Sequence, residues 1–262
     1  MNLLTVDSLT QRYSRSAAHL ALDNVSLEIN AGESIALVGR SGCGKSTLAR
    51  LLTGLERPES GCVRYRNHPV TELDRQQRNA FRRDVQLVFQ DAFSAVNPRL
   101  RIGDIISEPL RHLTSLSRPE RQEKAARMLE AVGLDASLLT QRPAQLSGGQ
   151  LQRVSLARAL VIEPRLIILD EAVSSLDVVI QAQILELLRK LRQQLGVAFL
   201  FITHDLRLVG SFCQRVIVMD NGKIAEDVAI NGDLRLTSPA GQALRRAILP
   251  ALPVARPMLA TA

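Results

Sequence analysis

The chain has 262 residues, and its composition, with 46% hydrophobic and 23% charged residues, is that of an ordinary globular protein. This length suits one large α/β domain or a core domain that carries an insert. The formal net charge is +7, but the chain has no tryptophan, two tyrosines and six phenylalanines, so few rings are available to stack on bases. The composition therefore disfavours a function in nucleic-acid binding.

Cysteine usage and hydropathy argue against several further classes of protein. Cys43, Cys62 and Cys213 are widely spaced and form no Cys-x-x-Cys pair, which disfavours a disulfide framework or a zinc or iron–sulfur site and fits a reducing cytosol. The first ten residues lack a basic region followed by a long apolar run, so we expect no signal peptide. The longest apolar run, residues 197–202, is too short for a bilayer span, which takes about 20 residues.

Two strands are predicted ahead of the first glycine-rich loop. Residues 25–29 alternate apolar and polar side chains, as a half-buried strand does. Residues 34–38 form a short apolar run that ends at Gly39 and indicates a buried strand. A helix over residues 45–52 follows the loop, and residues 85–89 are a further strand.

Arginines supply most of the positive charge, and their densest stretch lies just before the strand over residues 85–89. It consists of Arg75, Arg78, Arg82 and Arg83. Nucleic acid, anionic lipid and acidic protein surfaces all bind such stretches. We interpret this one as a solvated helix face.

The pattern is helical from residue 91 to residue 163. Apolar residues recur there at intervals of three and four, which places them on one face of each helix. They are Ile102, Ile105, Ile106, Leu110 and Leu113 in one helix and Ala125, Leu129 and Val132 in the next. We therefore predict an all-helical insert.

Three apolar runs predict strands in the second half of the chain: residues 166–169, 197–203 and 216–219. The last run leads into Asp-Asn-Gly at residues 220–222, which is a hairpin signal. An amphipathic helix over residues 180–195 separates the first two. Strands that alternate with helices favour a largely parallel sheet with helices on both faces.

The predicted sheet places several chemically active residues at one edge. Ligands of parallel sheets bind beyond the carboxyl ends of the strands. The residues at those ends are Gly39, Gln90, Asp170, Glu171 and His204. We expect the functional site at this edge.

The first motif is a match to the phosphate-binding loop, with a buried strand before it and a helix after it. Its residues are Gly39, Arg40, Ser41, Gly42, Cys43, Gly44, Lys45, Ser46 and Thr47. The glycines let backbone N–H groups surround the β-phosphate, and the helix N-terminus adds a favourable dipole. Lys45 reaches the β- and γ-phosphates, and the Ser46 hydroxyl binds Mg²⁺. Cys43 is interpreted as a small filler of the loop.

The second motif is an apolar strand that ends in two carboxylates, Asp170 and Glu171. Charge at a buried sheet edge needs a partner, and Mg²⁺ supplies one for Asp170. Glu171 can polarise the attacking water as a general base. The alternative is a strand that simply ends in surface acids, and the neighbouring phosphate loop disfavours it.

The third motif, here called the signature string, is Leu146-Ser147-Gly148-Gly149-Gln150, and we predict a helix from residue 151 to about residue 161. Ser147 is a good N-cap, and the glycines leave backbone N–H groups bare, so the string is a second phosphate site. It belongs to the helical insert, so one nucleotide is not expected to meet both glycine-rich loops of one chain. A second chain docked head to tail would bring its string to the first chain's γ-phosphate. Ordinary helix capping explains Ser147 but not the whole string.

Over residues 2–235 the chain resembles the ATP-binding-cassette (ABC) ATPases. The motifs occur in the family's order: phosphate loop, Gln90 after a strand, signature string, the two carboxylates, Ser-Ser-Leu-Asp at residues 174–177, and His204. The resemblance implies an α/β fold: a P-loop NTPase core with a mostly parallel sheet, an N-terminal antiparallel β part and an inserted α-helical subdomain. It also implies that ATP and Mg²⁺ are bound.

The resemblance further implies the roles of single residues. Gln90 joins Mg²⁺ and the attacking water to the membrane subunit, and His204 contacts the γ-phosphate. Asp177 lies in the loop that contacts the opposite ATP site. Tyr13 stands where the family places an aromatic ring that stacks on adenine, with simple packing as the alternative. The implied catalytic residues are Glu171, His204 and Gln90, and the implied Mg²⁺ ligands are Ser46, Gln90 and Asp170.

Further strings resemble the dipeptide, oligopeptide and nickel importer branch of the family. They are Phe-Gln-Asp at residues 89–91, Asn-Pro-Arg at 97–99 and Ile-Gln-Ala-Gln-Ile at 180–184. That branch usually reads Glu-Pro-Thr where residues 171–173 read Glu-Ala-Val. This departure, together with residues 81–84, Arg207 and residues 212–215, is similar to the nickel-importing members.

The resemblance therefore implies an ATP-hydrolysing subunit of a binding-protein-dependent importer that couples hydrolysis to nickel import across the inner membrane. The alternatives are a dipeptide or oligopeptide importer, a soluble cassette ATPase that acts on nucleic acid or ribosomes, and a degenerate subunit that binds ATP structurally. The implied partners are a second, related ATPase subunit, two membrane permease subunits and, indirectly, a periplasmic substrate-binding protein, with no nucleic acid. The implied location is peripheral, on the cytoplasmic face of the inner membrane.

These considerations predict one ATP-binding domain over residues 2–247. Its core comprises residues 2–90 and 164–247, and its helical insert comprises residues 91–163. Residues 248–262 contain three prolines and are expected to be a disordered tail.

Overall fold

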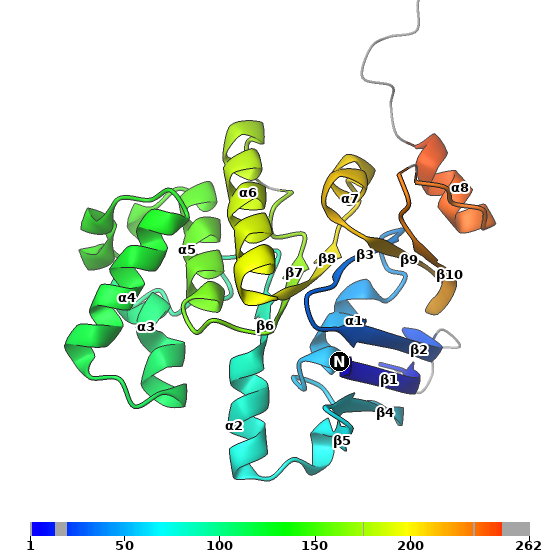
Figure 1. The fold of residues 1–262 in the computed structure, drawn as a ribbon, viewed down its shortest axis with the longest axis horizontal. Coiled ribbons are helices and arrows are strands. Elements are labelled where there is room, and N and C mark those ends of the chain that lie inside the picture. The colour runs from blue at the N-terminus through cyan, green and yellow to red at the C-terminus, as the bar shows by residue number, and fades with distance from the viewer. Residues whose placement is uncertain (1, 14–19, 175, 233, 248–262) are drawn as a thin grey trace, which may run out of the picture.

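The computed structural model describes residues 2–13, 20–174, 176–232 and 234–247 (Figure 1). Its strands are β1 (Asn2–Gln11), β2 (Leu22–Asn30), β3 (Ser34–Gly39), β4 (Ser60–Tyr65), β5 (His68–Pro69), β6 (Val85–Val88), β7 (Leu166–Asp170), β8 (Ala198–Ile202), β9 (Arg215–Asp220) and β10 (Lys223–Ala229). Its helices are α1 (Lys45–Leu52), α2 (Arg75–Asp84), α3 (Ile102–Leu113), α4 (Arg118–Ala131), α5 (Gly148–Leu160), α6 (Val178–Leu195), α7 (Leu206–Phe212) and α8 (Pro239–Arg246). The tail over residues 248–262, which we expected to be disordered, lies outside the described residues.

A six-stranded sheet in the order β10-β9-β3-β8-β7-β6 forms the centre of the fold. The strands from β9 to β6 run parallel to their neighbours, and β10 is antiparallel at one edge. Asn221 and Gly222 connect β9 to β10 with positive φ angles of 46° and 78°, which are the angles of a type I′ hairpin turn. The largely parallel sheet and the hairpin are therefore confirmed.

The central strands are buried on both faces, because alternate side chains of a strand point to opposite sides of the sheet. In β3, Ala36 and Val38 belong to one apolar cluster, whereas Ile35 and Leu37 belong to a second. Strands β7, β8 and β9 divide their residues between the two clusters in the same alternating way. The sheet is thus a middle layer that needs a cover on each side.

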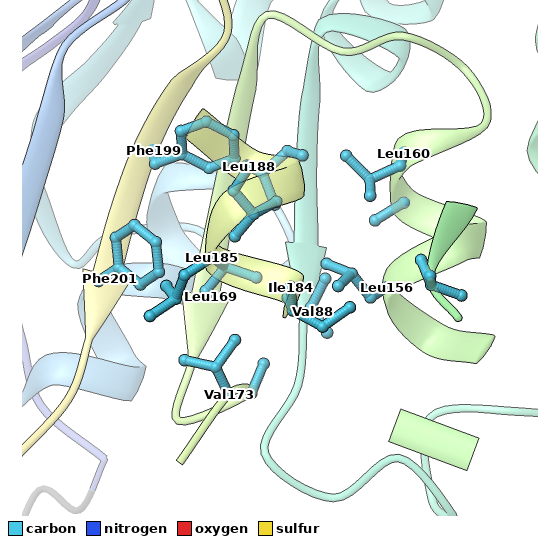
Figure 2. Close-up of a cluster of buried hydrophobic side chains, with 14 of the residues drawn as sticks. Val88, Leu156, Leu160, Leu169, Val173, Ile184, Leu185, Leu188, Phe199 and Phe201 are labelled. Carbon is cyan, nitrogen blue, oxygen red and sulfur yellow. The ribbon is translucent and has the colours of Figure 1, made fainter. Parts of the chain in front are cut away.

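Helix α6 covers one face of the sheet. Figure 2 shows Phe199 and Phe201 of β8 beside Leu185 and Leu188 of α6. Burial of one such side chain contributes about 1.5–3 kcal/mol relative to leaving it in water. Helix α6 ends at Gly196, whose φ of 65° is the left-handed conformation that commonly closes a helix.

The other face is covered by α1 and by a four-stranded antiparallel sheet in the order β2-β1-β4-β5. Strand β1 pairs with β2 on one side and with β4 on the other. This arrangement confirms the antiparallel N-terminal part. Helix α2 follows that sheet and carries the four arginines of the basic stretch on its exposed side, as predicted.

A buried carboxylate ties the antiparallel sheet to the central one. Asp84 is 2% exposed and accepts hydrogen bonds from the Tyr65 hydroxyl (2.6 Å) and from Arg66 Nη2 (2.7 Å). Arg165 Nε, just ahead of β7, lies 3.4 Å from the same carboxylate. Burial and the hydrogen bond to Asp84 raise the pKa of Tyr65, so its hydroxyl stays a donor.

Helices α3, α4 and α5 lie together beyond the β6 edge of the sheet (Figure 1). The apolar residues that recur along the sequence there, such as Ile105 and Leu129, are buried and continue the cluster that covers the sheet. Because that cluster is continuous, the limits of the insert at residues 91–163, and those of the core at 2–90 and 164–247, stay our proposal. No helix in the described part of the chain is both long enough and apolar enough to cross a membrane.

Candidate active site

The phosphate loop connects β3 to α1 and closes on its own lysine. Lys45 is 9% exposed, and its Nζ donates to the carbonyl oxygens of Gly39 (2.8 Å) and Arg40 (2.9 Å). A Cβ on Gly44 would lie 2.3 Å from the carbonyl oxygen of Ala21, and its φ of 107° is open mainly to glycine. Cys43 is buried, as its interpretation as a filler of the loop requires. The loop carbonyls thus hold the ammonium inside the phosphate loop.

Ser46 and Asp170 meet at the end of β7, beside the phosphate loop. Burial raises the pKa of Asp170, and a hydrogen bond from the Ser46 hydroxyl opposes this effect. One hydroxyl oxygen and one carboxylate are a donor set that fits Mg²⁺, which is usually bound by one or two carboxylates together with water and substrate phosphates. The described residues contain no group of three or more His, Cys, Asp or Glu residues that could hold a metal ion.

The three residues predicted to be catalytic lie together. Gln90 Nε2 donates to Glu171 Oε2 over 3.0 Å, and His204 Nδ1 lies 3.7 Å from Glu171 Oε1. The three side chains follow β6, β7 and β8, so the parallel order of these neighbouring strands brings them to one edge. Glu171 has a positive φ of 50°, and its N–H donates to the carbonyl oxygen of Ile202 over 2.9 Å. Each oxygen of the Glu171 carboxylate therefore has one side-chain neighbour.

Thr203 supports this edge, and the sequence analysis assigned it no role. It is 1% exposed, and its Oγ1 accepts a hydrogen bond from the N–H of Asp205 (3.0 Å) and lies 3.5 Å from Ser174 Oγ. These contacts fix the chain on both sides of His204. The sequence signal for Thr203 is its position: it is a polar residue at the end of an apolar strand, directly before the predicted site residue His204.

Tyr13 lies beside α1, with 58% of its surface exposed. Its hydroxyl donates to Glu56 Oε2 over 2.6 Å, accepts from Arg50 Nη2 over 2.9 Å, and lies 3.3 Å from Thr47 Oγ1. Arg50 and Glu56, which form an ion pair at 2.6 Å, thus hold the ring next to the phosphate loop. An exposed ring in this position can stack on a nucleotide base, and this role stays a prediction.

The signature string begins α5 and is open to solvent. The Ser147 side chain accepts from the N–H of Gln150, and the Gln150 side chain accepts from the N–H of Ser147, which is a capping box. Because of this box, α5 begins at Gly148, three residues before the predicted start. No atom lies within 4 Å of a Cβ placed on Gly148. Within the described ranges, no hydrogen bond or ion pair joins the string to residues 39–47.

Asp177 is the N-cap of α6, where its side chain accepts from the N–H of Ile180 over 3.0 Å. The next two side chains, Val178 and Val179, are 80% and 67% exposed. This end of α6 is therefore an uncovered surface with a carboxylate held at its centre. Its predicted contact with the opposite site stays a prediction.

Comparison with known proteins places this geometry in a family. The profile of the ABC transporter family matches residues 22–174. The nickel import ATP-binding protein NikE of Shigella dysenteriae serotype 1 is 58% identical over 98% of each chain, and NikE of Escherichia coli K12 is 57% identical over the same share.

Solved structures agree with this result. The dimeric structure of the ATP-binding cassette MJ0796 in a post-hydrolysis state, bound to ADP and Pi, is 31% identical with a TM-score of 0.81. It covers 88% of this chain and 100% of its own. The structure of cbiO1 from Clostridium perfringens, part of the ABC transporter complex cbiONQ, has a TM-score of 0.72 at 29% identity and covers 87% of this chain and 88% of its own. The cassette fold and the resemblance are confirmed, and the chain belongs to the ABC transporter family, as an ATP-hydrolysing subunit.

Proposed function

We propose that this chain hydrolyses ATP to drive a binding-protein-dependent importer of nickel ions in the inner membrane. The observation that carries the ATPase part is the placement of Gln90 and His204 on the two oxygens of Glu171. The identity of 58% with a nickel import ATP-binding protein, over 98% of both chains, supports the cargo.

The residues of the chain divide the chemistry among them. The Lys45 ammonium, which two loop carbonyls hold in the phosphate loop, offsets the charge of the β- and γ-phosphates. Glu171 takes a proton from the attacking water, and Gln90 and His204 hold its carboxylate in place. Ser46, Asp170 and Gln90 would hold Mg²⁺, which supplies positive charge beside the phosphate oxygens when it is bound.

The exposed signature string supports a second ATPase chain as partner. Its glycine N–H groups face solvent at the start of α5, which is an anion-binding arrangement. Among the described residues, no hydrogen bond or ion pair connects the string to the phosphate loop of its own chain. The solved relative MJ0796 is a dimer. We propose a head-to-tail pair with a related but different ATPase, with Asp177 at the contact, so the purified chain alone should hydrolyse ATP poorly.

The wider assembly follows from the family. We propose that two membrane permease subunits bind the pair and that a periplasmic substrate-binding protein delivers the cargo to them. The chain would then lie on the cytoplasmic face of the inner membrane as a peripheral subunit, without contact to nucleic acid.

The departure at residues 171–173 marks a branch rather than a cargo contact. Ala172 and Val173 are 4% and 2% exposed and belong to the apolar cluster between the sheet and α6 (Figure 2). They cannot touch a transported ion or peptide from this position. The choice between nickel and dipeptides therefore needs a transport measurement.

Uptake in cells tests the proposal. A strain that lacks this chain should lose uptake of radioactive nickel and regain it with the wild-type chain, but not with Glu171→Gln. Uptake of a radioactive dipeptide should stay the same in all three strains. Restoration of dipeptide uptake in place of nickel uptake would move the chain to the peptide importers.

A further inference from the structure

Two polar side chains of α5 bond to the loop that carries Gln90. Gln152 Nε2 donates to the carbonyl oxygen of Phe89 over 3.2 Å, and Arg158 Nη1 donates to that of Ala95 over 2.8 Å. Phe89 and Ala95 stand on either side of Gln90. The two hydrogen bonds therefore hold both ends of the loop over residues 89–95 on one helix.

Gln152 is buried and Arg158 is half-buried. Gln152 is 3% exposed, and burial lowers the pKa of Arg158 whereas the charge of Glu108 opposes this effect. Among the described residues no carboxylate forms an ion pair with Arg158, and its one side-chain hydrogen bond goes to Ala95. The backbone carbonyl of Ala95 is therefore the group that orients this guanidinium.

Apolar contacts bring the same loop into the core of the helical part. Ala92 and Val96, both 7% exposed, belong to the cluster that also contains Leu151 and Val154 of α5. Gln152 and Arg158 are six residues apart, which is about 9 Å along a helix axis. The loop is thus attached to α5 by a hydrogen bond at each end, so the two should move together.

This attachment joins the signature string to Gln90, and we assign these two features to different nucleotides. Helix α5 begins with the glycines of the signature string, which we assign to the nucleotide of the partner chain. The loop carries Gln90, which contacts Glu171, the general base for the chain's own nucleotide. A displacement of α5 at its first turn would therefore change the position of Gln90.

We propose that Gln152 and Arg158 are positioning residues that hold the Gln90 loop on α5 and thereby maintain the Gln90–Glu171 contact. The inference rests on the proposed function, because it requires Glu171 to act as the general base for ATP hydrolysis.

A double-mutant cycle in the assembled importer tests this inference. Gln152→Met removes the amide at nearly constant volume, and Arg158→Met removes the guanidinium. Each should lower kcat for ATP hydrolysis by roughly 3- to 10-fold, as expected for one lost hydrogen bond, with KM unchanged. In a Gln90→Ala background the same changes should alter kcat by less than about twofold, because both residues act through Gln90. Single-turnover hydrolysis measures the slow variants.

Arg153 provides a matched control on the same helix. Its Nη1 donates to the carbonyl oxygen of Gly133 over 2.7 Å, which lies outside the Gln90 loop. Arg153→Met should change kcat by the same factor with and without Gln90→Ala. Arg158→Lys, which keeps a donor, should recover part of the lost kcat, and Gln152→Asn replaces Gln152→Met if that variant does not assemble.

The outcomes separate this inference from the proposed function. Equal factors for the Gln152 and Arg158 variants in both backgrounds would overturn the positioning role and leave the ATPase assignment intact. A wild-type complex without ATP hydrolysis would overturn the proposed function itself.

Discussion

The phosphate loop and the signature string are both glycine-rich turns that begin a helix, yet the fold encloses one and exposes the other. The phosphate loop wraps Lys45, which is 9% exposed, and packs Gly44 against the backbone at Ala21. The string is capped only by Ser147 and Gln150, and Gly148 has open space around it. The same local chemistry is thus enclosed by the fold in one turn and left open in the other.

The phosphate loop also borders a cavity whose opposite wall belongs to the C-terminal part of the chain. Residues 40–43 line this cavity of about 440 Å³ together with Asn221 and with Ala240 and Ala243 of α8. Helix α8 is held in turn by Glu226 of β10, which accepts hydrogen bonds from the backbone and side chains of Thr237 and Ser238. One wall of the cavity is therefore positioned by residues outside the cassette motifs.

The largest effect should come from the general base, which leaves both turns intact. Glu171→Gln should lower kcat by roughly 10²- to 10⁴-fold, because a positioned general base contributes about that much. Both turns should still bind ATP, so the variant should accumulate as an ATP-bound dimer with its partner. ATPase assays and light scattering with ATP check this, and turnover at the wild-type rate would contradict the role of Glu171.

Lys45→Ala removes the ammonium that the phosphate loop encloses, so this loop should lose its advantage over the signature string in binding ATP. Lys45→Ala should weaken ATP binding by roughly 100-fold, since loss of one partner from a buried charged contact costs about 2–5 kcal/mol. Equilibrium titration with a fluorescent ATP analogue measures the Kd. Gln145→Ala, outside both turns, is the control, and an unchanged Kd in Lys45→Ala would remove the support for the phosphate loop.

The same substitution at one glycine of each turn should give opposite results. Gly44→Ala should destabilise the fold by roughly 3 kcal/mol, because it combines a left-handed φ with a clash against Ala21. Gly148→Ala should change stability by less than about 0.5 kcal/mol, as at an ordinary surface site. It should nevertheless lower ATP hydrolysis by the assembled complex. Urea unfolding and ATPase assays check both, and equal losses of stability would contradict the comparison.

The smallest effect should come from Glu226, which holds α8 at the cavity beside the phosphate loop. Although burial raises the pKa of Glu226, hydrogen bonds from Ser238 and Thr237 outweigh it and hold this pKa below its ordinary value of 4.5. The ionised form is therefore favoured by folding, and its contribution is present above pH 4.5 and lost as the pH falls through the folded pKa.

Glu226→Gln should consequently lower stability by about 1 kcal/mol at pH 7 and by less at lower pH. Urea unfolding at several pH values measures the difference between the two chains. A difference that grows on acidification would have the wrong sign for this role.

The sequence predicted those parts of the fold and site that are determined by residues adjacent to one another along the chain. Helix α1 was predicted over residues 45–52 and is found there, because a buried strand, a glycine-rich loop and a helix follow one another directly. The meeting of Gln90, Glu171 and His204 was also expected, since the carboxyl ends of parallel strands share one edge. The catalytic roles of these residues stay predictions.

Contacts between distant segments were not predictable in this way. Gln152 bonds to Phe89 across 63 residues, and Tyr65 bonds to Asp84 across 19, and no spacing rule announces either pair. The early start of α5 depends on a capping box that draws two glycines, which are poor helix formers, into the first turn. These features depend on tertiary packing rather than on local pattern.

The backbone conformation at Glu171 lowers the stability of the fold at a residue whose side chain we expect ATP hydrolysis to require. Its φ of 50° lies in the left-handed region, which costs a residue with a side chain about 1–2 kcal/mol relative to the usual conformations. Glycine would adopt this angle without that strain, so Glu171→Gly should unfold at a higher temperature than the wild-type chain and hydrolyse no ATP. Selection for stability alone would thus remove the carboxylate, and its presence at a strained position supports the catalytic role that we propose for Glu171.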